Sequence, residues 1–305
     1  MTNNTTKTPG LASRLVNTVL SIKPLADFAK NQARKMMIQR AEAIGVPWRE
    51  NVKQLRSHDW EKEIKTVQNP QLTYPDYYLT SFHGYEKGNL SWDAAFEVES
   101  AAYAVHAKIW PEAGAQGDSK LRQSYHDVLQ KQIAIEPKTI LDLGCGVGMS
   151  TLTLQQIYPE AKITGVDLSP YFLAVAQHLA KEKNASINLL HSAAEATILP
   201  DNSFDFVSAS LVFHELPQAP AVQILREVRR LLRLGGYFAL MDMNPDSQFF
   251  RKLPPYILTL LKSTEPYLDQ YMTLNIKQAL IEAGFQTPTI ISNSPRHRTI
   301  LSVST

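Results

Sequence analysis

The amino-acid sequence predicts an α/β protein whose larger part is a mostly parallel β-sheet covered by helices. From about residue 119, short apolar runs alternate with amphipathic helical stretches, which is the pattern of repeated β-α-β units. The first run leads into a glycine-rich loop, and the second ends in an acidic residue. The last two runs are joined by a turn too short for a crossover helix, so they should pair antiparallel.

The expected elements follow one another along residues 119–305. The apolar runs predict strands at residues 139–143, 163–166, 187–190, 204–209, 237–241, 287–291 and 299–303. Periodic apolar positions predict helices at residues 150–158, 170–182, 219–232 and 276–283. We expect Ser169 to cap the helix that Pro170 begins. We also expect Gly235 and Gly236 to end the helix of residues 219–232.

The first 118 residues have a different texture and should form a mainly helical region before the sheet domain of residues 119–305. Two amphipathic helical patterns lie within residues 11–44. Residues 45–95 are rich in aromatic side chains but have no clean period, and residues 94–110 predict a further helix that ends at a turn.

Composition excludes several classes of protein. The formal net charge of +2 over 305 residues gives no basic footprint for nucleic acid. The single cysteine permits neither an intrachain disulfide nor a cysteine zinc cluster, and we expect no metal site. No stretch approaches the roughly 18 apolar residues of a membrane span. These features predict a soluble, cytoplasmic protein, and they leave its oligomeric state open.

The strongest functional signal is the run Ile-Leu-Asp-Leu-Gly-Cys-Gly-Val-Gly at residues 140–148. A strand that enters such a loop lets a ligand lie against bare backbone at the start of a helix. The next strand ends at Asp167, where an acid can accept hydrogen bonds from both hydroxyls of a ribose. The dinucleotide fingerprint needs a third glycine at the place of Met149, whereas Gly148 comes one residue early. The mismatch favours S-adenosylmethionine (SAM), which has no pyrophosphate, over NAD.

At these residues the chain resembles the class I SAM-dependent methyltransferases, in particular the small-molecule branch that includes quinone-biosynthesis enzymes. The resemblance covers residues 136–245 and depends on the motifs at residues 141–148, 165–170, 200–205 and 231–236. Residues 82–92 also look like the segment before this domain in a plant and cyanobacterial group. The resemblance implies a Rossmann-like, seven-stranded, mostly parallel sheet with an antiparallel last strand.

The resemblance also implies how SAM would be held. We expect the methionine arm to lie along Gly144, Gly146 and Gly148, and Asp142 to order this loop. Asp167 would bind the ribose, and Leu168 would lie beside the adenine. The backbone of Ser210 would accept a hydrogen bond from the SAM ammonium. The family often has Asp-Ala-Glu where this chain has Ala193, Ala194 and Glu195. Because the first acid is missing, adenine would depend on the Ala194 backbone or on Ser192.

His214 and Glu215 are the candidate catalytic residues. They follow the fourth expected strand, at the carboxyl edge of the sheet where open α/β proteins bind their ligands. A base is needed only when the methyl acceptor has a proton to lose. The alternative, which is equally favoured, is that the pair forms a surface turn capping the next helix.

The N-terminal region offers a cover for this site. We expect residues 45–110 to shape the acceptor pocket, with Tyr78, His83, Tyr85 and Trp92 facing the acceptor. Residues 1–50 have eight basic and three acidic side chains, so the helices of residues 11–44 suit an anionic membrane. Packing of those helices against the domain is the favoured alternative.

The sequence therefore predicts transfer of a methyl group from SAM to a small, hydrophobic or aromatic metabolite. Two alternatives stay open: an NAD-dependent oxidoreductase, and a SAM-binding protein without catalysis. The acceptor, and whether oxygen, nitrogen or carbon is methylated, are left open by the sequence.

Overall fold

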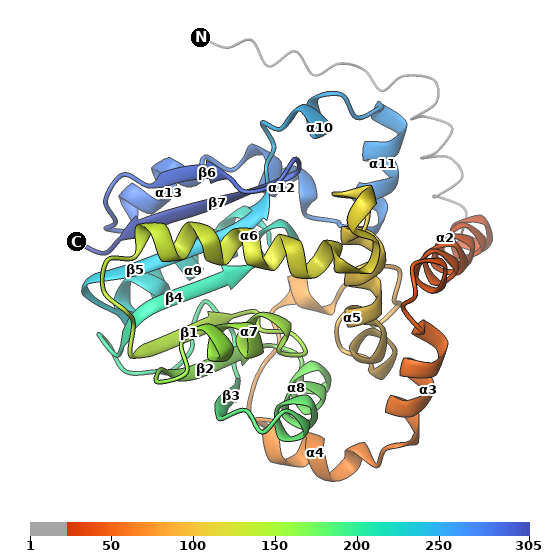
Figure 1. The fold of residues 1–305 in the computed structure, drawn as a ribbon, viewed down its shortest axis with the longest axis horizontal. Helices are drawn as coiled ribbons and strands as arrows, with labels where there is room; N and C mark the ends of the chain where they lie inside the picture. Colours follow the sequence, from red (N-terminus) through yellow and green to blue (C-terminus); the bar gives the residue numbers. More distant parts are fainter. Residues whose placement is uncertain (1–22) are drawn as a thin grey trace.

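A computed structural model describes residues 23–305 of the chain, and Figure 1 shows a sheet flanked by helices. The expected helical pattern before residue 23 lies outside the described residues. The strands are β1 (Thr139–Leu143), β2 (Lys162–Asp167), β3 (Ile187–His191), β4 (Phe204–Ser210), β5 (Leu232–Met243), β6 (Thr289–Ser292) and β7 (His297–Val303). They form one seven-stranded sheet in the order β3-β2-β1-β4-β5-β7-β6.

The sheet confirms the predicted topology, which is mostly parallel with an antiparallel last strand in the chain. Strands β1 to β5 pair in parallel with their neighbours, whereas β7 runs antiparallel to both β5 and β6. The order reverses between β1 and β4, so a crevice opens there at the carboxyl ends of the strands.

Helices cover both faces of the sheet. The helices of the sheet domain are α6 (Gly117–Gln132), α7 (Met149–Ile157), α8 (Pro170–Glu182), α9 (Gln218–Leu231) and α13 (Ile276–Glu282). Alternate strand residues point to opposite faces because side chains alternate along a strand. One core therefore joins β1, β4 and β5 to α6 and α7, through residues that include Ile140, Phe206, Leu121 and Leu154. The other joins the same strands to α9 and α13, through residues that include Leu141, Val207, Leu225 and Leu280.

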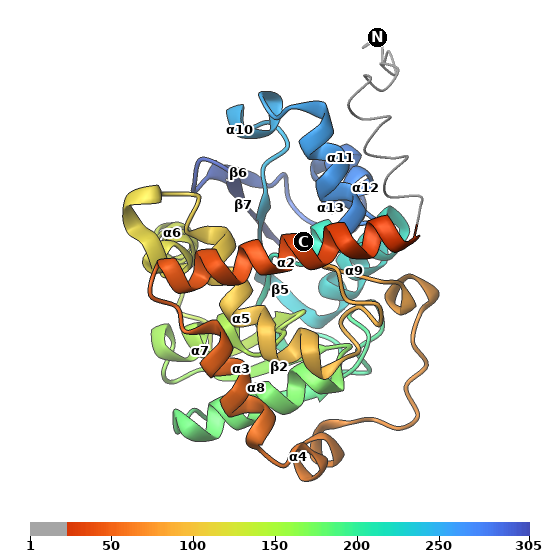
Figure 2. The ribbon, with the colours of Figure 1, turned by 90° about the vertical axis from the view of Figure 1, so that its right-hand side faces the viewer.

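Two further groups of elements surround the carboxyl edge. The N-terminal group is α2 (Lys23–Ala43), α3 (Trp48–Ser57), α4 (Trp60–Val67), η1 (Asp76–Leu79), α5 (Trp92–His106) and η2 (Pro111–Gln116). The other group is η3 (Phe213–Glu215) after β4, together with α10 (Gln248–Arg251), α11 (Pro255–Thr264) and α12 (Leu268–Thr273) after β5. Figure 2 shows α2 lying across the front of α5, with α11 and α12 nearby.

A half-buried ion pair ties α2 to α5. Glu97 of α5 is fully buried, and its carboxylate accepts hydrogen bonds from Arg34 of α2 and from the hydroxyl of Tyr85. Ile38 and Ala41 of α2 are also buried, in a small core with Trp48 and Ala104. The C-terminal half of α2 is therefore a packed part of the structure.

The predicted end of α9 at Gly235 and Gly236 is wrong. The helix ends at Leu231, and β5 begins at Leu232, which already pairs with Phe204. The register of this pair shifts before Phe206. The left-handed φ of +79° at Gly235 thus belongs to an irregularity inside the strand, where a bulge commonly requires glycine.

The helix predicted at residues 94–110 begins and ends earlier, as α5. Its start is fixed by Ser91, whose hydroxyl accepts a hydrogen bond from the backbone N–H of Ala94 at 3.3 Å. The cap expected for α8 is present, because the Ser169 hydroxyl accepts from the N–H of Phe172. Both caps satisfy amide groups that have no partner inside the helix.

Candidate active site

The glycine loop between β1 and α7 has the backbone shape that its sequence predicts. Gly144, Gly146 and Gly148 have φ angles of +65°, +54° and +86°, a region that L side chains rarely adopt. At Gly144 the space is also closed, since an added Cβ would lie 2.5 Å from Cγ2 of Val212. The loop can take this path only with glycine at that position.

Asp142 holds the loop to the first turn of α7. It is fully buried, and its Oδ2 accepts hydrogen bonds from the hydroxyls of Ser150 at 2.8 Å and Thr151 at 2.7 Å. Burial raises the pKa of Asp142 to about 6, although both hydroxyls favour its charged form.

Asp167 lies at the carboxyl end of β2, beside the same loop. Its two oxygens accept from the backbone N–H groups of Gly146 and Ser169, both at 2.8 Å. Burial raises the pKa of Asp167 to about 6, against the effect of these two donors. Each carboxylate oxygen has a second lone pair, so the group can still accept hydrogen bonds from a ligand.

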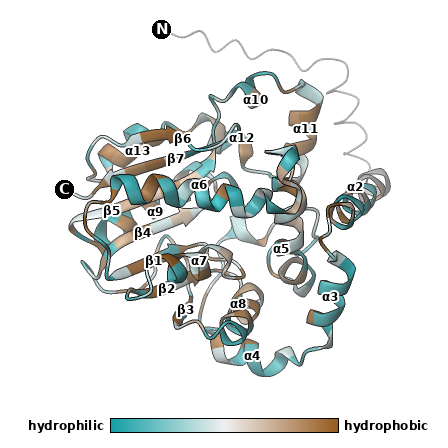
Figure 3. Cartoon of the chain, viewed as in Figure 1, coloured by the Kyte–Doolittle hydropathy of each residue, from teal (hydrophilic) through white to brown (hydrophobic). Residues whose placement is uncertain are grey.

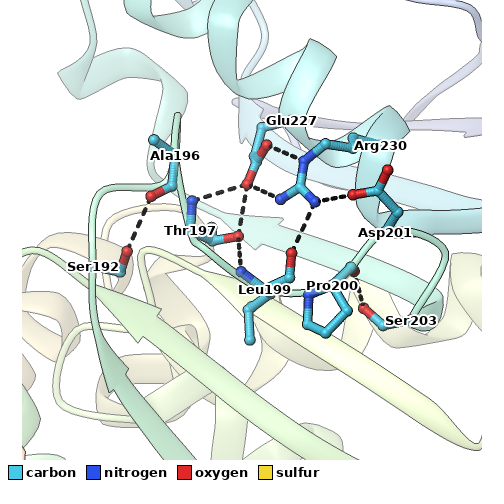
Figure 4. A network of polar contacts seen from close by, with 9 residues as sticks. All are labelled: Ser192, Ala196, Thr197, Leu199, Pro200, Asp201, Ser203, Glu227 and Arg230. Carbon is cyan, nitrogen blue, oxygen red and sulfur yellow. Dashed lines mark hydrogen bonds and ion pairs between the residues drawn. The ribbon is translucent and has the colours of Figure 1, made fainter.

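The segment after β3 carries the residues expected beside adenine, and Figure 4 shows the polar network that anchors it. Glu227 of α9 accepts from the amide and hydroxyl of Thr197 at 2.9 and 2.7 Å, and it is paired with Arg230. Arg230 also donates to the carbonyl of Leu199 at 2.8 Å and pairs with Asp201. This network therefore fixes the segment after β3 to helix α9 of the sheet domain.

Of the expected adenine residues, Ser192 and Ala194 line the central cavity, as does Leu168. Ala193 is not among the lining residues. The carboxylate of Glu195 accepts from the Tyr77 hydroxyl at 2.9 Å, so it links the segment to η1 instead.

One continuous cavity of about 590 Å³ connects these groups, which is within the usual range of ligand pockets, about 300–1,000 Å³. Gly144, Gly146, Asp167 and Ser210 line it at the sheet edge. The rest of its wall is mainly apolar and comes from both surrounding groups, with side chains that include Met37, Phe82, Val98, Phe250 and Leu261. In Figure 3 the strands and α11 are largely hydrophobic, whereas α3 and α4 are largely hydrophilic.

His214 lies in the wall of this cavity rather than on the surface. Its backbone N–H donates to Oδ2 of Asp242 at 3.1 Å, and its Nδ1 lies 2.8 Å from Oδ1 of the same carboxylate. Burial opposes the imidazolium, but the Asp242 charge outweighs it and raises the pKa of His214 to about 10. Nε2 is the ring nitrogen that stays available to a ligand.

Glu215 and His83 lie beside His214. Oε2 of Glu215 accepts from the Asn89 amide at 3.2 Å, and Oε1 is 3.6 Å from Nε2 of His83. The same His83 nitrogen is 2.8 Å from Oε1 of Glu265. The side chain of His83 is 35% exposed, and its partial desolvation lowers its pKa, but the two carboxylates overcome this and raise it to about 9. Burial also raises the pKa of Glu215, against the effect of the two histidines.

Three of the four residues expected to face the acceptor line the cavity. Tyr78, His83 and Tyr85 do so, and burial together with the charges of Asp167 and Glu215 raises the pKa of Tyr78. Trp92 lies elsewhere. It packs against Phe96, Trp60 and Tyr171, with ring centroids 4.9 to 5.4 Å apart, in an aromatic core between α4, α5 and α8.

Asp242 and Glu265 were not predicted from the sequence. Asp242 lies on β5 near its carboxyl end, and the rule that led to Asp167 at the end of β2 could have found it. Glu265 follows α11 in an irregular stretch and carries no local signal. Helix α2 was also missed as part of the cavity wall, which it reaches through Asn31, Ala33, Arg34 and Met37.

Comparison with known proteins identifies the family. Residues 140–236 match a family model described as a methyltransferase domain. An uncharacterized methyltransferase of Synechocystis sp. is 31% identical over 164 residues, which cover 53% of this chain and 74% of that protein. A demethylmenaquinone methyltransferase of Listeria welshimeri is 32% identical over 152 residues. That match covers 48% of this chain and 64% of the relative's length.

The fold is shared with a solved structure of phosphoethanolamine N-methyltransferase 2 from Haemonchus contortus. That structure holds phosphomonomethylethanolamine and S-adenosylhomocysteine. It has a TM-score of 0.53 at 15% identity, and the match covers 71% of this chain and 60% of the other. Together with the glycine loop and Asp167, these similarities lead to one conclusion: the chain belongs to the class I SAM-dependent methyltransferases.

Proposed function

We propose that this protein transfers the methyl group of SAM to a small, apolar or aromatic metabolite. The observation that carries the proposal is the continuity of the cavity, which joins Asp167 and the glycine loop to the polar residues His214 and Glu215. Methyl transfer from a sulfonium is an in-line displacement in which the methyl is already activated. The protein mainly has to align the acceptor and exclude water.

The cavity supports an apolar acceptor with one polar end. Aliphatic and aromatic side chains line much of its wall, whereas His83, His214, Glu215 and Glu265 gather at one end. The Listeria relative named as a demethylmenaquinone methyltransferase fits the same chemistry. In this proposal residues 1–118 act as the lid region and residues 119–305 as the methyltransferase domain.

The cofactor assignment predicts that Asp167→Ala weakens SAM binding at least tenfold. The lost contacts would be hydrogen bonds from ribose hydroxyls to a buried carboxylate, each worth about 1.5–3 kcal/mol. Calorimetry with SAM measures the change, and Asp246→Ala is the control because its side chain is exposed. Asp167→Asn, which keeps the shape of the side chain, covers the case in which the alanine variant unfolds. Unchanged affinity in both Asp167 variants would remove the cofactor assignment.

A strain that lacks the gene for this protein should accumulate the unmethylated acceptor. An organic extract of that strain, incubated with the protein and with SAM labelled in the methyl group, should yield labelled product. A protein that binds SAM but labels nothing in such extracts would instead be a SAM-binding protein without catalysis.

We further propose that the mouth of the cavity rests on an anionic membrane. Phe28 and Met36 of α2 are 66% and 58% exposed, and Tyr256 and Leu260 of the nearby α11 are more than 40% exposed. Lys35 of α2 is exposed as well, and a basic side chain near an anionic surface contributes about 1 kcal/mol to such a contact. An apolar acceptor could then enter directly from the lipid. None of the helices in residues 23–305 is long and apolar enough to cross a membrane.

The membrane proposal predicts that the double variant Phe28→Glu, Met36→Glu loses most of its sedimentation with phosphatidylglycerol vesicles at low salt. The matched control is Leu234→Glu, because Leu234 is 79% exposed in β5 and does not line the cavity. SAM binding should be unaffected in both proteins. If the wild-type protein never sediments with these vesicles, α2 serves only to pack against α5.

A further inference from the structure

The structure places two histidines and a glutamate from distant parts of the chain at one point of the cavity. His83 lies between η1 and α5, His214 lies in η3 after β4, and Glu265 follows α11. Each offers one ligand atom, and the three atoms lie within 4.8 Å of one another. No metal site was predicted from the sequence, and no local spacing connects residues 83, 214 and 265.

We propose that His83, His214 and Glu265 bind a divalent transition-metal ion at the acceptor end of the cavity. Two imidazoles and one carboxylate form a donor set that suits Zn²⁺, Mn²⁺ or Fe²⁺, whereas Mg²⁺ prefers oxygen ligands alone. Oε1 of Glu215 lies 3.6 Å from Nε2 of His83, so this carboxylate is placed to supply a further oxygen ligand. The remaining coordination positions would face the cavity.

The groups around the three residues are those expected behind metal ligands. Histidines that bind metals usually donate their other ring N–H to a carboxylate or carbonyl, which fixes the ring and its tautomer. Asp242 holds Nδ1 of His214 in this way at 2.8 Å, and it is itself fully buried. Asn89 in turn holds the carboxylate of Glu215.

Glu265 provides an independent indication. It is only 8% exposed, and its Oε2 is buried without a hydrogen-bond partner among the described residues. An unsatisfied buried carboxylate oxygen is costly, and a bound cation would satisfy it.

The backbone at His83 supports the same site. His83 has a φ of +50°, which is uncommon for a residue other than glycine, and its N–H donates to the carbonyl of Thr264 at 3.0 Å. This hydrogen bond joins the segment of His83 to that of Glu265. A strained conformation held by such a contact is typical of functional sites.

The role of the metal rests on the proposed function, but its binding does not. A divalent ion at this point would hold an oxygen of the acceptor and favour its deprotonated form, which is the better methyl acceptor. Metal binding can be measured without an acceptor and without SAM, so the two proposals can fail separately.

The test uses the full-length, untagged protein, stripped with a chelator and dialysed. Calorimetry and measured metal content should give about one Zn²⁺ or Mn²⁺ per chain and no uptake of Mg²⁺ under the same conditions. Glu265→Gln should lower the affinity for Zn²⁺ at least 100-fold. Asp242→Asn, which changes only the support of His214, should lower it about 10- to 100-fold. His178→Asn is the control, because this imidazole lies on α8 and does not line the cavity.

SAM binding by each variant shows that it is folded, and His83→Asn replaces any variant that fails this check. Wild-type protein that takes up no Zn²⁺ or Mn²⁺, or a Glu265→Gln variant with wild-type affinity for Zn²⁺, would overturn the metal site. Metal uptake without SAM binding would leave the metal site standing and contradict the proposed function instead.

Discussion

Gly144→Ala should lower the affinity for SAM about 100-fold. The φ of +65° at this position costs an L residue about 1–2 kcal/mol. The new Cβ would also lie 2.5 and 2.9 Å from the two methyl groups of Val212, a β-branched side chain with little freedom to move. Overpacking of this kind costs about 1–3 kcal/mol. The loop would have to shift away from η3, and it would then no longer lie against the methionine arm.

Substitutions at two other glycines distinguish the effect of backbone strain from the loss of the cofactor site. Gly146 has a similar φ of +54°, but an added Cβ there would meet only Phe172, at 3.9 Å. Gly146→Ala should therefore affect SAM binding less than Gly144→Ala does. Gly235 has a φ of +79°, an added Cβ there would have no heavy atom within 4 Å, and the residue does not line the cavity. Gly235→Ala should therefore lower thermal stability without changing SAM affinity. Calorimetry and thermal unfolding measure these effects. Wild-type affinity in Gly144→Ala would mean that the loop does not contact the cofactor.

The parts of the fold that were predictable are those set by local pattern. The strand of residues 139–143 and the helix of residues 170–182 have the predicted bounds, because an apolar run and a Ser-Pro start are both readable within a few residues. Gly235 shows the limit of such patterns. A pair of glycines after a helix usually ends it, but here the pairing of Leu232 with Phe204 begins the next strand first.

The candidate site was predictable where it follows strand ends and was missed where it depends on tertiary contacts. Asp167 ends β2, and His214 and Glu215 lie in the turn after β4, so sheet topology alone brings them to one edge. Glu265 joins them only because the segment after β5 folds back and hydrogen-bonds to the backbone of His83. Trp92 shows the reverse error, since an aromatic residue near the cavity is used for packing between helices.

Glu215→Gln should lower the rate of methyl transfer about 100-fold, the usual effect of losing a general base, while SAM affinity stays unchanged. The substitution keeps the shape of the side chain but removes the carboxylate that faces the cavity. His214→Ala should lower the rate by a similar factor, because it removes the imidazole beside Glu215 at the acceptor end of the cavity. The double variant should be little slower than either single one, since groups that act as a unit are not additive.

The rate is measured as the initial transfer of label from SAM into the organic extract of the deletion strain. Glu282→Gln is the matched control, because Glu282 is exposed on α13 and does not line the cavity. Normal rates in both single variants would mean that His214 and Glu215 serve only to shape the turn between β4 and α9. A normal rate in Glu215→Gln alone would leave His214, held by Asp242, as the residue of this pair on which methyl transfer depends.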